Sequence, residues 1–260
     1  SLYCPRGKGL GGSSSMNAML YVRGRPLDYD LWEAQGATGW GWEGVKDYFL
    51  KSENRETGPS EYHAVGGPLN VADENSPRAV TETFLVAAQA AGIPRIEDYN
   101  GPEQDGAALV QVTQRNGRRL STSEAFLRPA MKRPNVTVLT GAHASRVLFD
   151  GTRAVGVEYR RKGAIHQARA AREVILSGGA INSPQLLMLS GIGPAQDLQA
   201  LGLPVVVNNR NVGQNLNDHQ GINYTWRMKV PTYNDILRPW WGKMLVGMKY
   251  FASGTGPLAK

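Results

Sequence analysis

Residues 7–30 read GKGLGGSSSMNAMLYVRGRPLDYD, and this stretch decides how the fold is interpreted. Three of its glycines have the G-x-G-x-x-G spacing of a dinucleotide-binding fingerprint, namely Gly7, Gly9 and Gly12. That fingerprint needs a hydrophobic strand directly before it and a helix directly after it. Here only residues 2–4 precede the glycines as an apolar run, and Pro5 cannot donate a hydrogen bond to a central strand. We therefore reject a Rossmann interpretation of these glycines.

The part of this stretch from residue 10 to residue 17 predicts a ligand-binding loop. Gly11 and Gly12 allow the backbone to approach a ligand closely, and the three serines that follow are expected to open a helix. Exposed N–H groups at the start of a helix suit a phosphate or pyrophosphate. Asn17, one turn later, can both donate and accept hydrogen bonds. On these residues alone, an ordinary glycine–serine loop that caps a helix is the alternative.

The composition is that of a globular protein. Of the 260 residues, 41% are hydrophobic and 20% are charged, which excludes general disorder. The net charge is +7, from 29 basic and 22 acidic residues. The basic residues form no stripe within a recognisable nucleic-acid-binding module. We therefore predict a solvated basic surface and no nucleic-acid partner.

The single cysteine and the hydropathy pattern bear on the compartment. Cys4 has no second cysteine to pair with, which fits a reducing environment. No apolar run reaches the length of a membrane span, and no signal peptide is visible at Ser1. We predict a cytoplasmic protein. The excess of basic over acidic residues and the tryptophan-rich C-terminal segment leave open a peripheral association with the cytoplasmic face of a membrane.

Local patterns predict a mixture of helices and strands. Helices are expected after Ser76-Pro77 up to Gly92, from Ser121 to just before Pro129, and from Ser183-Pro184 to Gly191. Strands are expected over Val136–Leu139, Arg146–Phe149, Ala154–Arg160 and Glu173–Ser177, with a turn at Asp150-Gly151.

Two long stretches together resemble a known family. Residues 7–30 resemble the first sequence signature of the glucose–methanol–choline (GMC) oxidoreductases, and residues 179–193, GAINSPQLLMLSGIG, resemble the second. The run VGQNLNDH at residues 212–219 also looks like this family. The resemblance covers nearly the whole chain and is nearest to the branch of choline and aliphatic-alcohol dehydrogenases.

The resemblance implies a fold and a division into domains. It implies an α/β (α+β) class, with part of an FAD-binding domain and part of a substrate domain built on an antiparallel sheet. The FAD-binding domain would comprise residues 1–52 and 134–217. The substrate domain would comprise residues 53–133 and 218–260.

The resemblance also implies which residues contact the flavin. Gly12 and Ser13 would face the pyrophosphate, and the isoalloxazine would be lined by Asn17, Ala18, Met19 and Leu20. Ala144 matches a position whose backbone contacts the adenine, although it can equally be a plain strand residue. Some members bind the flavin covalently through a histidine just before the asparagine. Met16 stands there and has no nucleophilic nitrogen, so we predict non-covalent FAD.

No catalytic residue is expected within the chain. The resemblance places the family's strand–glycine loop–helix for the ADP moiety before Ser1 and its catalytic histidine beyond Lys260. His219, next to Asp218, is then expected to be a structural hydrogen-bonding residue. The three other histidines show no metal-ligand spacing and no pattern of partners, namely His63, His143 and His166. No serine lies within G-x-S-x-G, so a serine nucleophile is not supported.

The implied reaction is FAD-dependent oxidation of a small-molecule alcohol to the aldehyde, with hydride transfer to flavin N5. A quinone or oxygen would then accept the electrons. This segment alone is expected to be inactive. Two alternatives stay open at this point. A relative of the same fold can act as a lyase or a fatty-acid photodecarboxylase, and a truncated, non-catalytic piece can serve only to bind a partner.

Overall fold

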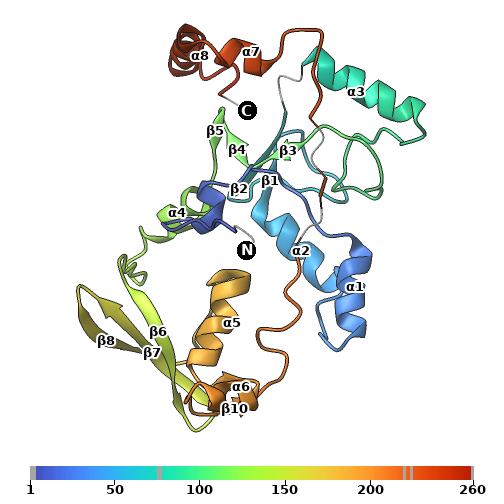
Figure 1. Cartoon of the computed structure of the whole chain (residues 1–260). Helices are drawn as coiled ribbons and strands as arrows, with labels where there is room; N and C mark the ends of the chain where they lie inside the picture. Colours follow the sequence, from blue (N-terminus) through green and yellow to red (C-terminus); the bar gives the residue numbers. More distant parts are fainter. Residues whose placement is uncertain (1–3, 75–77, 219–220, 223–224, 259–260) are drawn as a thin grey trace. The chain divides into compact units, whose positions relative to one another are not determined.

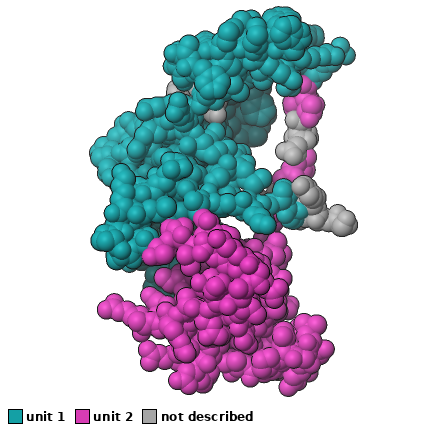
Figure 2. Space-filling model, turned by 90° about the vertical axis from the view of Figure 1, so that its left-hand side faces the viewer, with its two compact units in different colours: residues 1–136, 227–260 teal, residues 137–226 magenta. Residues whose placement is uncertain are grey.

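A computed structural model describes residues 4–74, 78–218, 221–222 and 225–258 of the chain (Figure 1). The chain forms two compact units, residues 1–136 with 227–260, and residues 137–226 (Figure 2). Both units contain helices and strands, so the mixed class expected from the sequence is confirmed. The assignment of flavin and substrate domains stays a prediction, because compact units are defined by packing and not by what they bind.

A small mixed sheet lies at the centre of the first unit. Its strands, in the order β1-β2-β3, are β1 (Glu53–Arg55), β2 (Leu69–Asp73) and β3 (Gln111–Val112). β1 and β2 are parallel, and β3 is antiparallel to β2. Val71 on β2 is fully buried, and Leu20 forms an antiparallel bridge to Val112. The stretch that begins with the glycine-rich segment is therefore joined to the sheet at its C-terminal end, through Leu20.

A tight hairpin follows directly after the sheet. It joins β4 (Gln114–Arg115) to β5 (Arg118–Arg119) through Asn116 and Gly117. Both turn residues have positive φ, 52° and 68°, which is the conformation that an Asn-Gly hairpin turn favours. This turn places Arg119 on the short strand that returns toward the glycine-rich segment.

Helices surround the sheet of the first unit. They are α1 (Pro26–Ala34), α2 (Trp42–Ser52), α3 (Ala79–Ala90), α4 (Arg128–Ala130), α7 (Tyr233–Leu237) and α8 (Trp240–Ser253), with a 3₁₀ turn η1 (Gly12–Ser15) and a π-helical turn η2 (Ser123–Leu127). α2 begins where Trp42 N donates to Asp30 Oδ1 at 2.9 Å. The ring of Tyr29 lies 5.7 Å from those of both Trp42 and Phe49, so aromatic packing joins α1 to α2.

The second unit is an antiparallel sheet with helices. The strands β6 (His143–Asp150), β7 (Arg153–Arg161) and β8 (Ala164–Arg169) follow one another in the sheet, with α5 (Gly179–Leu189), α6 (Ala195–Ala200) and a short parallel pair, β9 (Ile192–Gly193) and β10 (Val207–Asn208). Ser190 joins α5 to β6, because its Oγ accepts from Val147 N at 2.8 Å and donates to Leu186 O at 2.5 Å.

Several predicted elements are confirmed. β6 and β7 form the expected hairpin with its turn at Asp150-Gly151. α3 is the helix expected before Gly92, although its predicted start at Ser76-Pro77 lies outside the described residues. Gly191 follows the end of α5 with φ +89°, as expected of a glycine that stops a helix.

Four details of the predicted elements are wrong. Val136–Leu139 and Glu173–Ser177 are not strands, because neither pairs with another strand among the described residues. α5 begins at Gly179 rather than at Ser183-Pro184, and Pro184 lies inside it. The helical segment after Ser121 continues through Pro129 to Ala130, since proline is tolerated in the first turn of the separate helix α4.

Candidate functional site

The segment from Gly7 to Asn17 folds into a compact turn around two glycines. Gly11 and Gly12 have φ of 89° and 53°, a region that favours glycine. The space next to the Gly11 Cα is filled, because a Cβ there would lie 2.4 Å from Ser15 Oγ. The space next to the Gly12 Cα is empty, because a Cβ there would meet no described atom within 4 Å. Gly12 therefore leaves a face of backbone that a ligand can approach.

Gly7 and Gly12, two of the three regularly spaced glycines, allow two parts of the backbone to pack closely against each other. A Cβ on Gly7 would lie 2.2 Å from Gly12 O, and Gly7 N donates to Ser13 Oγ at 3.2 Å. No strand precedes the turn within the described residues 4–11. The helix expected after Gly12 is only the single turn η1, so that prediction is wrong. The Ser13 N–H, which has no acceptor among the described residues, remains as a donor for an anion.

Asn17 is held by two donors on its side-chain oxygen. Arg119 Nη1 donates to Asn17 Oδ1 at 2.7 Å, and Met19 N donates to the same oxygen at 3.0 Å. Arg119 also donates to the backbone, from Nη1 to Ser14 O at 3.1 Å and from Nη2 to Asn17 O at 2.7 Å. The guanidinium thus fixes both the turn and the asparagine.

The residues on both sides of Asn17 present apolar side chains to solvent. Met19 has φ of 63°, an uncommon conformation for a residue with a side chain that often marks a functional segment. Its carbonyl accepts from Thr113 N at 2.8 Å. Met16 is 56% exposed and Leu20 51%, and Ala18 is also exposed. Exposed apolar side chains on both sides of a fixed amide fit one edge of a planar aromatic ring.

Ala144 lies in the second unit. It is half-buried on β6 and borders a hollow of about 430 Å³ that is also lined by residues 174–178 and by Asn182 and Ser183 of α5. The expected strand over residues 173–177 is instead an irregular segment along this hollow. The hollow could hold a planar group, but the adenine contact of Ala144 stays a prediction.

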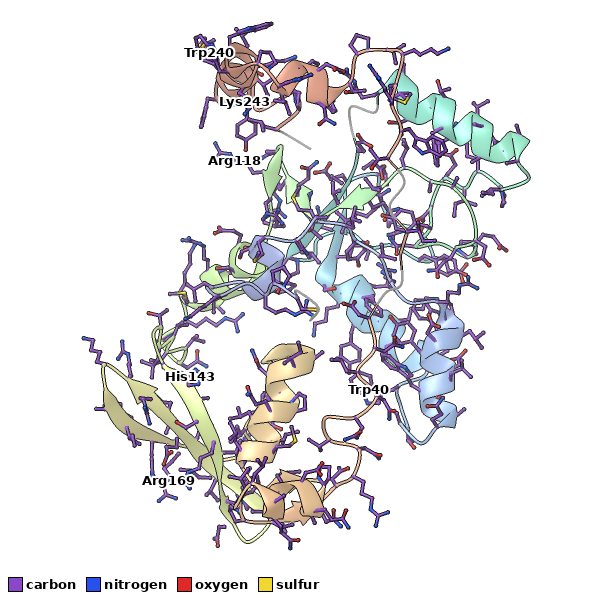
Figure 3. The ribbon with its side chains drawn as sticks, viewed as in Figure 1. Trp40, Arg118, His143, Arg169, Trp240 and Lys243 are labelled. Carbon is purple, nitrogen blue, oxygen red and sulfur yellow. The ribbon has the colours of Figure 1, made fainter. Side chains whose placement is uncertain are left out.

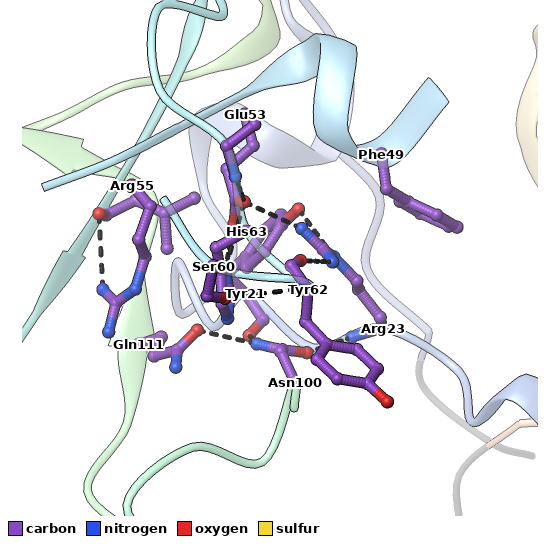
Figure 4. A network of polar contacts seen from close by, with 12 residues as sticks. Tyr21, Arg23, Phe49, Glu53, Arg55, Ser60, Tyr62, His63, Asn100 and Gln111 are labelled. Carbon is purple, nitrogen blue, oxygen red and sulfur yellow. Dashed lines mark hydrogen bonds and ion pairs between the residues drawn. The ribbon is translucent and has the colours of Figure 1, made fainter. Parts of the chain in front are cut away.

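A buried cluster of charges lies next to the C-terminal end of the loop, which we define as residues 12–20 (Figure 4). His63 is 5% exposed. Its Nδ1 lies 2.9 Å from Glu53 Oε1 and its Nε2 lies 2.8 Å from Asp98 Oδ2. Arg23 Nη2 lies 2.9 Å from Glu53 Oε2. Two cations thus face two carboxylates inside the first unit. The expectation that His63 has no pattern of partners is wrong.

The cluster keeps His63 charged. Burial opposes the imidazolium, but the hydrogen bonds to Asp98 and Glu53 outweigh it and raise the pKa of His63 to about 9. Burial also opposes the Asp98 carboxylate, yet hydrogen bonds from His63 and from Asn100 N lower its pKa to about 2. The pKa of Glu53 is likewise lowered, against burial, by its hydrogen bond with His63. At neutral pH His63 therefore donates from both ring nitrogens.

Asn100 connects this cluster to the loop. Its Nδ2 donates to Tyr21 O at 2.9 Å, and its Oδ1 accepts from Arg23 N at 2.8 Å. Tyr21 and Arg23 follow the loop directly, so the cluster fixes the chain on one side of Leu20. Its charges compensate one another and it is buried, which indicates a structural role.

The loop has no side chain that can transfer a proton near neutral pH. None of residues 12–20 carries a side chain that titrates near neutral pH. What it offers is an open glycine backbone, a free N–H, a fixed carboxamide and exposed apolar side chains. These features fit an anionic cofactor with a planar ring. His219, expected to be structural, lies outside the described residues.

Residues 1–221 match the family model of the GMC oxidoreductases. The chain belongs to this family. It is 47% identical over 256 residues to the mitochondrial choline dehydrogenase of Homo sapiens, covering 98% of this chain and 43% of that protein. It is 44% identical over 262 residues to the oxygen-dependent choline dehydrogenase of Pseudomonas putida, covering 97% of this chain and 46% of that protein. The chain thus spans a little under half the length of these relatives.

Solved structures of the GMC type have the same fold. A formate oxidase structure superposes with a TM-score of 0.89 at 31% identity, covering 98% of this chain and 46% of that one. A pyridoxine 4-oxidase structure gives a TM-score of 0.73 at 33% identity, covering 78% of this chain and 40% of that one. The partial FAD-oxidoreductase fold expected from the sequence is confirmed.

Sequence reasoning missed the residues that hold the site in place. Arg119 stands beside Arg118 in the sequence, and nothing local indicates that it reaches Asn17. Thr122 was also missed, although its N donates to Ser14 Oγ at 2.9 Å. The partners of His63 come from two separate segments, so no spacing could have revealed them.

Within the described ranges, no helix has the length and apolar character needed to cross a membrane. Among the same residues, no group of three or more His, Cys, Asp and Glu side chains could hold a metal ion.

Proposed function

We propose that this chain supplies the ring-facing half of the flavin site in an FAD-dependent alcohol dehydrogenase, and that the complete enzyme oxidises choline or a similar alcohol to the aldehyde. The observation that carries the proposal is the loop itself. The open Gly12 backbone, the fixed Asn17 and the exposed apolar side chains all lie within residues 12–20. The identity to choline dehydrogenases supports the substrate class.

In this proposal each loop residue has a part in binding. Gly12 and Ser13 hold the pyrophosphate through backbone N–H groups, and Asn17, Ala18, Met19 and Leu20 line the ring. The bound FAD would supply the hydride acceptor. The chain's own residues orient that ring and exclude water from one of its edges. We retain the proposed flavin domain, residues 1–52 and 134–217, the substrate domain, residues 53–133 and 218–260, and the adenine contact of Ala144.

Anaerobic reduction tests the activity directly. Adding choline without oxygen to the flavoprotein that contains this chain should bleach the visible absorbance of the flavin, because the flavin is reduced by the hydride it accepts. Propyltrimethylammonium, which has the same cationic head but no hydroxyl group, is the matched control and should leave the spectrum oxidised. A flavin that stays oxidised with choline and with simple primary alcohols would contradict the proposal and favour a lyase or a photodecarboxylase.

The flavin should be bound without a covalent link. Met16 stands where a histidine would attach it, and a thioether is not a nucleophile of that kind. Acid precipitation of the holoenzyme should release all the yellow colour into the supernatant. Colour that stays with the pellet would contradict non-covalent binding.

We further propose a quinone as electron acceptor and a peripheral contact of the complete enzyme with the cytoplasmic face of a membrane. The exposed aromatic residues of α8 support the contact, because Trp240 (Figure 3) is 75% exposed and Phe251 is 86% exposed. Cosedimentation with lipid vesicles should fall when Trp240 and Trp241 are replaced by alanine. Oxygen uptake at the rate of choline oxidation, unchanged by an added quinone, would instead assign oxygen as the acceptor.

A further inference from the structure

The orientation of the Asn17 carboxamide is fixed by its surroundings. Its Oδ1 accepts two hydrogen bonds, from Arg119 Nη1 at 2.7 Å and from Met19 N at 3.0 Å. A carbonyl oxygen has two lone pairs, so both are used. Rotating the amide by half a turn would place its NH₂ group against two donors. The side chain therefore has one stable orientation, with Oδ1 turned toward Arg119 and Met19.

The opposite end of the carboxamide is the free end. Asn17 Nδ2 has no acceptor among the described residues, and the side chain is exposed. Asn17 was expected both to donate and to accept at a ligand. With its oxygen occupied, it can only donate.

Arg119 contributes most of this constraint. Three hydrogen bonds of its guanidinium go to the loop, to Ser14 O, Asn17 Oδ1 and Asn17 O. The side chain is half-buried on β5. Its neighbour Arg118 is exposed at the same hairpin (Figure 3), and although its backbone pairs with β4, its side chain forms no hydrogen bond or ion pair with the described residues. Only one of the two adjacent arginines is thus positioned to act on the loop.

We infer that Arg119 is a positioning residue that presents the Asn17 amide as a hydrogen-bond donor to an acceptor atom of the bound flavin ring. The inference rests on the proposed function. A flavin ring edge carries carbonyl oxygens and unprotonated nitrogens, and a fixed donor beside them stabilises the negative charge that the ring gains on reduction. Arg119 acts through Asn17, because the hydrogen bonds that its guanidinium donates go to Ser14 and Asn17 and not to a ligand.

The substitution Asn17→Asp separates the donor from the scaffold. Every hydrogen bond of Asn17 described above uses either Oδ1 or the backbone, and aspartate keeps both. Aspartate replaces the NH₂ group with a second oxygen and adds a negative charge, which faces Arg119. A purely structural role therefore predicts that stability is kept and that, once the added charge is screened by salt, flavin affinity is unchanged, whereas the donor role predicts that affinity falls while stability is kept.

The test titrates FAD into apoprotein prepared from the complete flavoprotein, using quenching of flavin fluorescence, and then measures the reduction potential of the bound flavin. For Asn17→Asp we expect about a tenfold or larger rise in the Kd of FAD, the size of one lost hydrogen bond, and a lower reduction potential. Repeating the titration at high salt removes long-range repulsion from the added charge. The loss should persist, because a missing contact is not screened.

Arg119 variants test the positioning step. Arg119→Ala should also weaken FAD binding about tenfold, Arg119→Lys should recover part of the loss through a single donor, and the control Arg118→Ala should match the wild type. If Arg119→Ala does not fold, Arg119→Lys still tests the positioning step, with an FAD affinity between those expected for the wild type and for full loss, and Asn17→Asp still tests the donor. Wild-type affinity and potential in Asn17→Asp would overturn the inference and leave the proposed function standing. Failure of the wild-type protein to bind FAD would overturn both.

Discussion

The buried cluster around His63 should make the stability of the first unit depend on pH. Because the folded-state pKa of His63 is about 9 and its unfolded value is about 6.5, the folded state holds this proton more tightly. The contribution is therefore fully present below about pH 6.5 and is lost as the pH rises through about 9. Linkage over this interval gives a loss of about 2 kcal/mol between pH 6 and pH 8, and about 3 kcal/mol by pH 9.

Asp98 sets the lower end of the window. Its folded-state pKa of about 2 lies below the unfolded value of about 3.9. Its contribution is thus present above about pH 4 and is lost as the pH falls toward about 2. The cluster is therefore most stabilising between about pH 4 and pH 6.5. Acid and alkali should each weaken it, by protonating Asp98 and by deprotonating His63.

Urea denaturation at a series of pH values measures the effect, with tryptophan fluorescence as the signal for the first unit, which holds five of the six tryptophans, the buried Trp42 among them. The variant His63→Gln should lose the decline in unfolding free energy between pH 6 and pH 9. The matched control is His143→Gln, because His143 is exposed on β6 (Figure 3). It should keep the wild-type pH profile.

Asp98→Asn provides a milder perturbation in case His63→Gln does not fold. Asp98 supplies one of the two carboxylate contacts of His63, and its side chain is 33% exposed. Removing its charge should lower the pKa of His63 and move the alkaline loss of stability to lower pH. An unfolding free energy that is flat from pH 6 to pH 9 in the wild type, or a slope that persists unchanged in both variants, would refute this account of the cluster.

Three further substitutions distinguish folding from binding. Gly11→Ala should destabilise the first unit by about 2 kcal/mol or more, because its Cβ would lie 2.4 Å from Ser15 Oγ; thermal denaturation measures this. Gly12→Ala should cost only about 1 kcal/mol but should weaken FAD binding in the same fluorescence titration, because its Cβ would fill the open face. Ser190→Ala should cost about 1–3 kcal/mol and speed hydrogen exchange at Val147 N, which loses its acceptor; unchanged exchange there would contradict this.

The sequence predicted best what depends on neighbouring residues. The β6–β7 hairpin follows from Asp150-Gly151, and the end of α5 follows from Gly191, because turn and capping chemistry act over a few residues. The family signatures likewise located the loop. Elements that depend on a distant partner were predicted poorly. Glu173–Ser177 has the composition of a strand, but Ile175 is 78% exposed and no described strand pairs with the segment.

The candidate site shows the same division. Gly12, Ser13 and Asn17 could be chosen from the sequence because they lie in one continuous motif. The orientation of Asn17 could not, because it is set by Arg119, 102 residues away in the sequence. His63 was misjudged for the same reason. Its carboxylate partners lie 10 and 35 residues away on either side, and neither separation corresponds to a helix or strand period.

Most of the hydrogen bonds that hold the loop come from one distant segment, residues 111–119. Ser14 and Asn17 are held by Arg119, the Met19 carbonyl accepts from Thr113 N, and Tyr21 N donates to Gln111 O. A left-handed Met19 and a single 3₁₀ turn have little stability of their own. The loop therefore depends on residues 111–119 for its shape, even though the motif that identifies the loop contains none of them. Substitutions in that segment should alter flavin binding without touching the flavin, and this makes the β3–β5 region as important to the site as the glycine-rich signature.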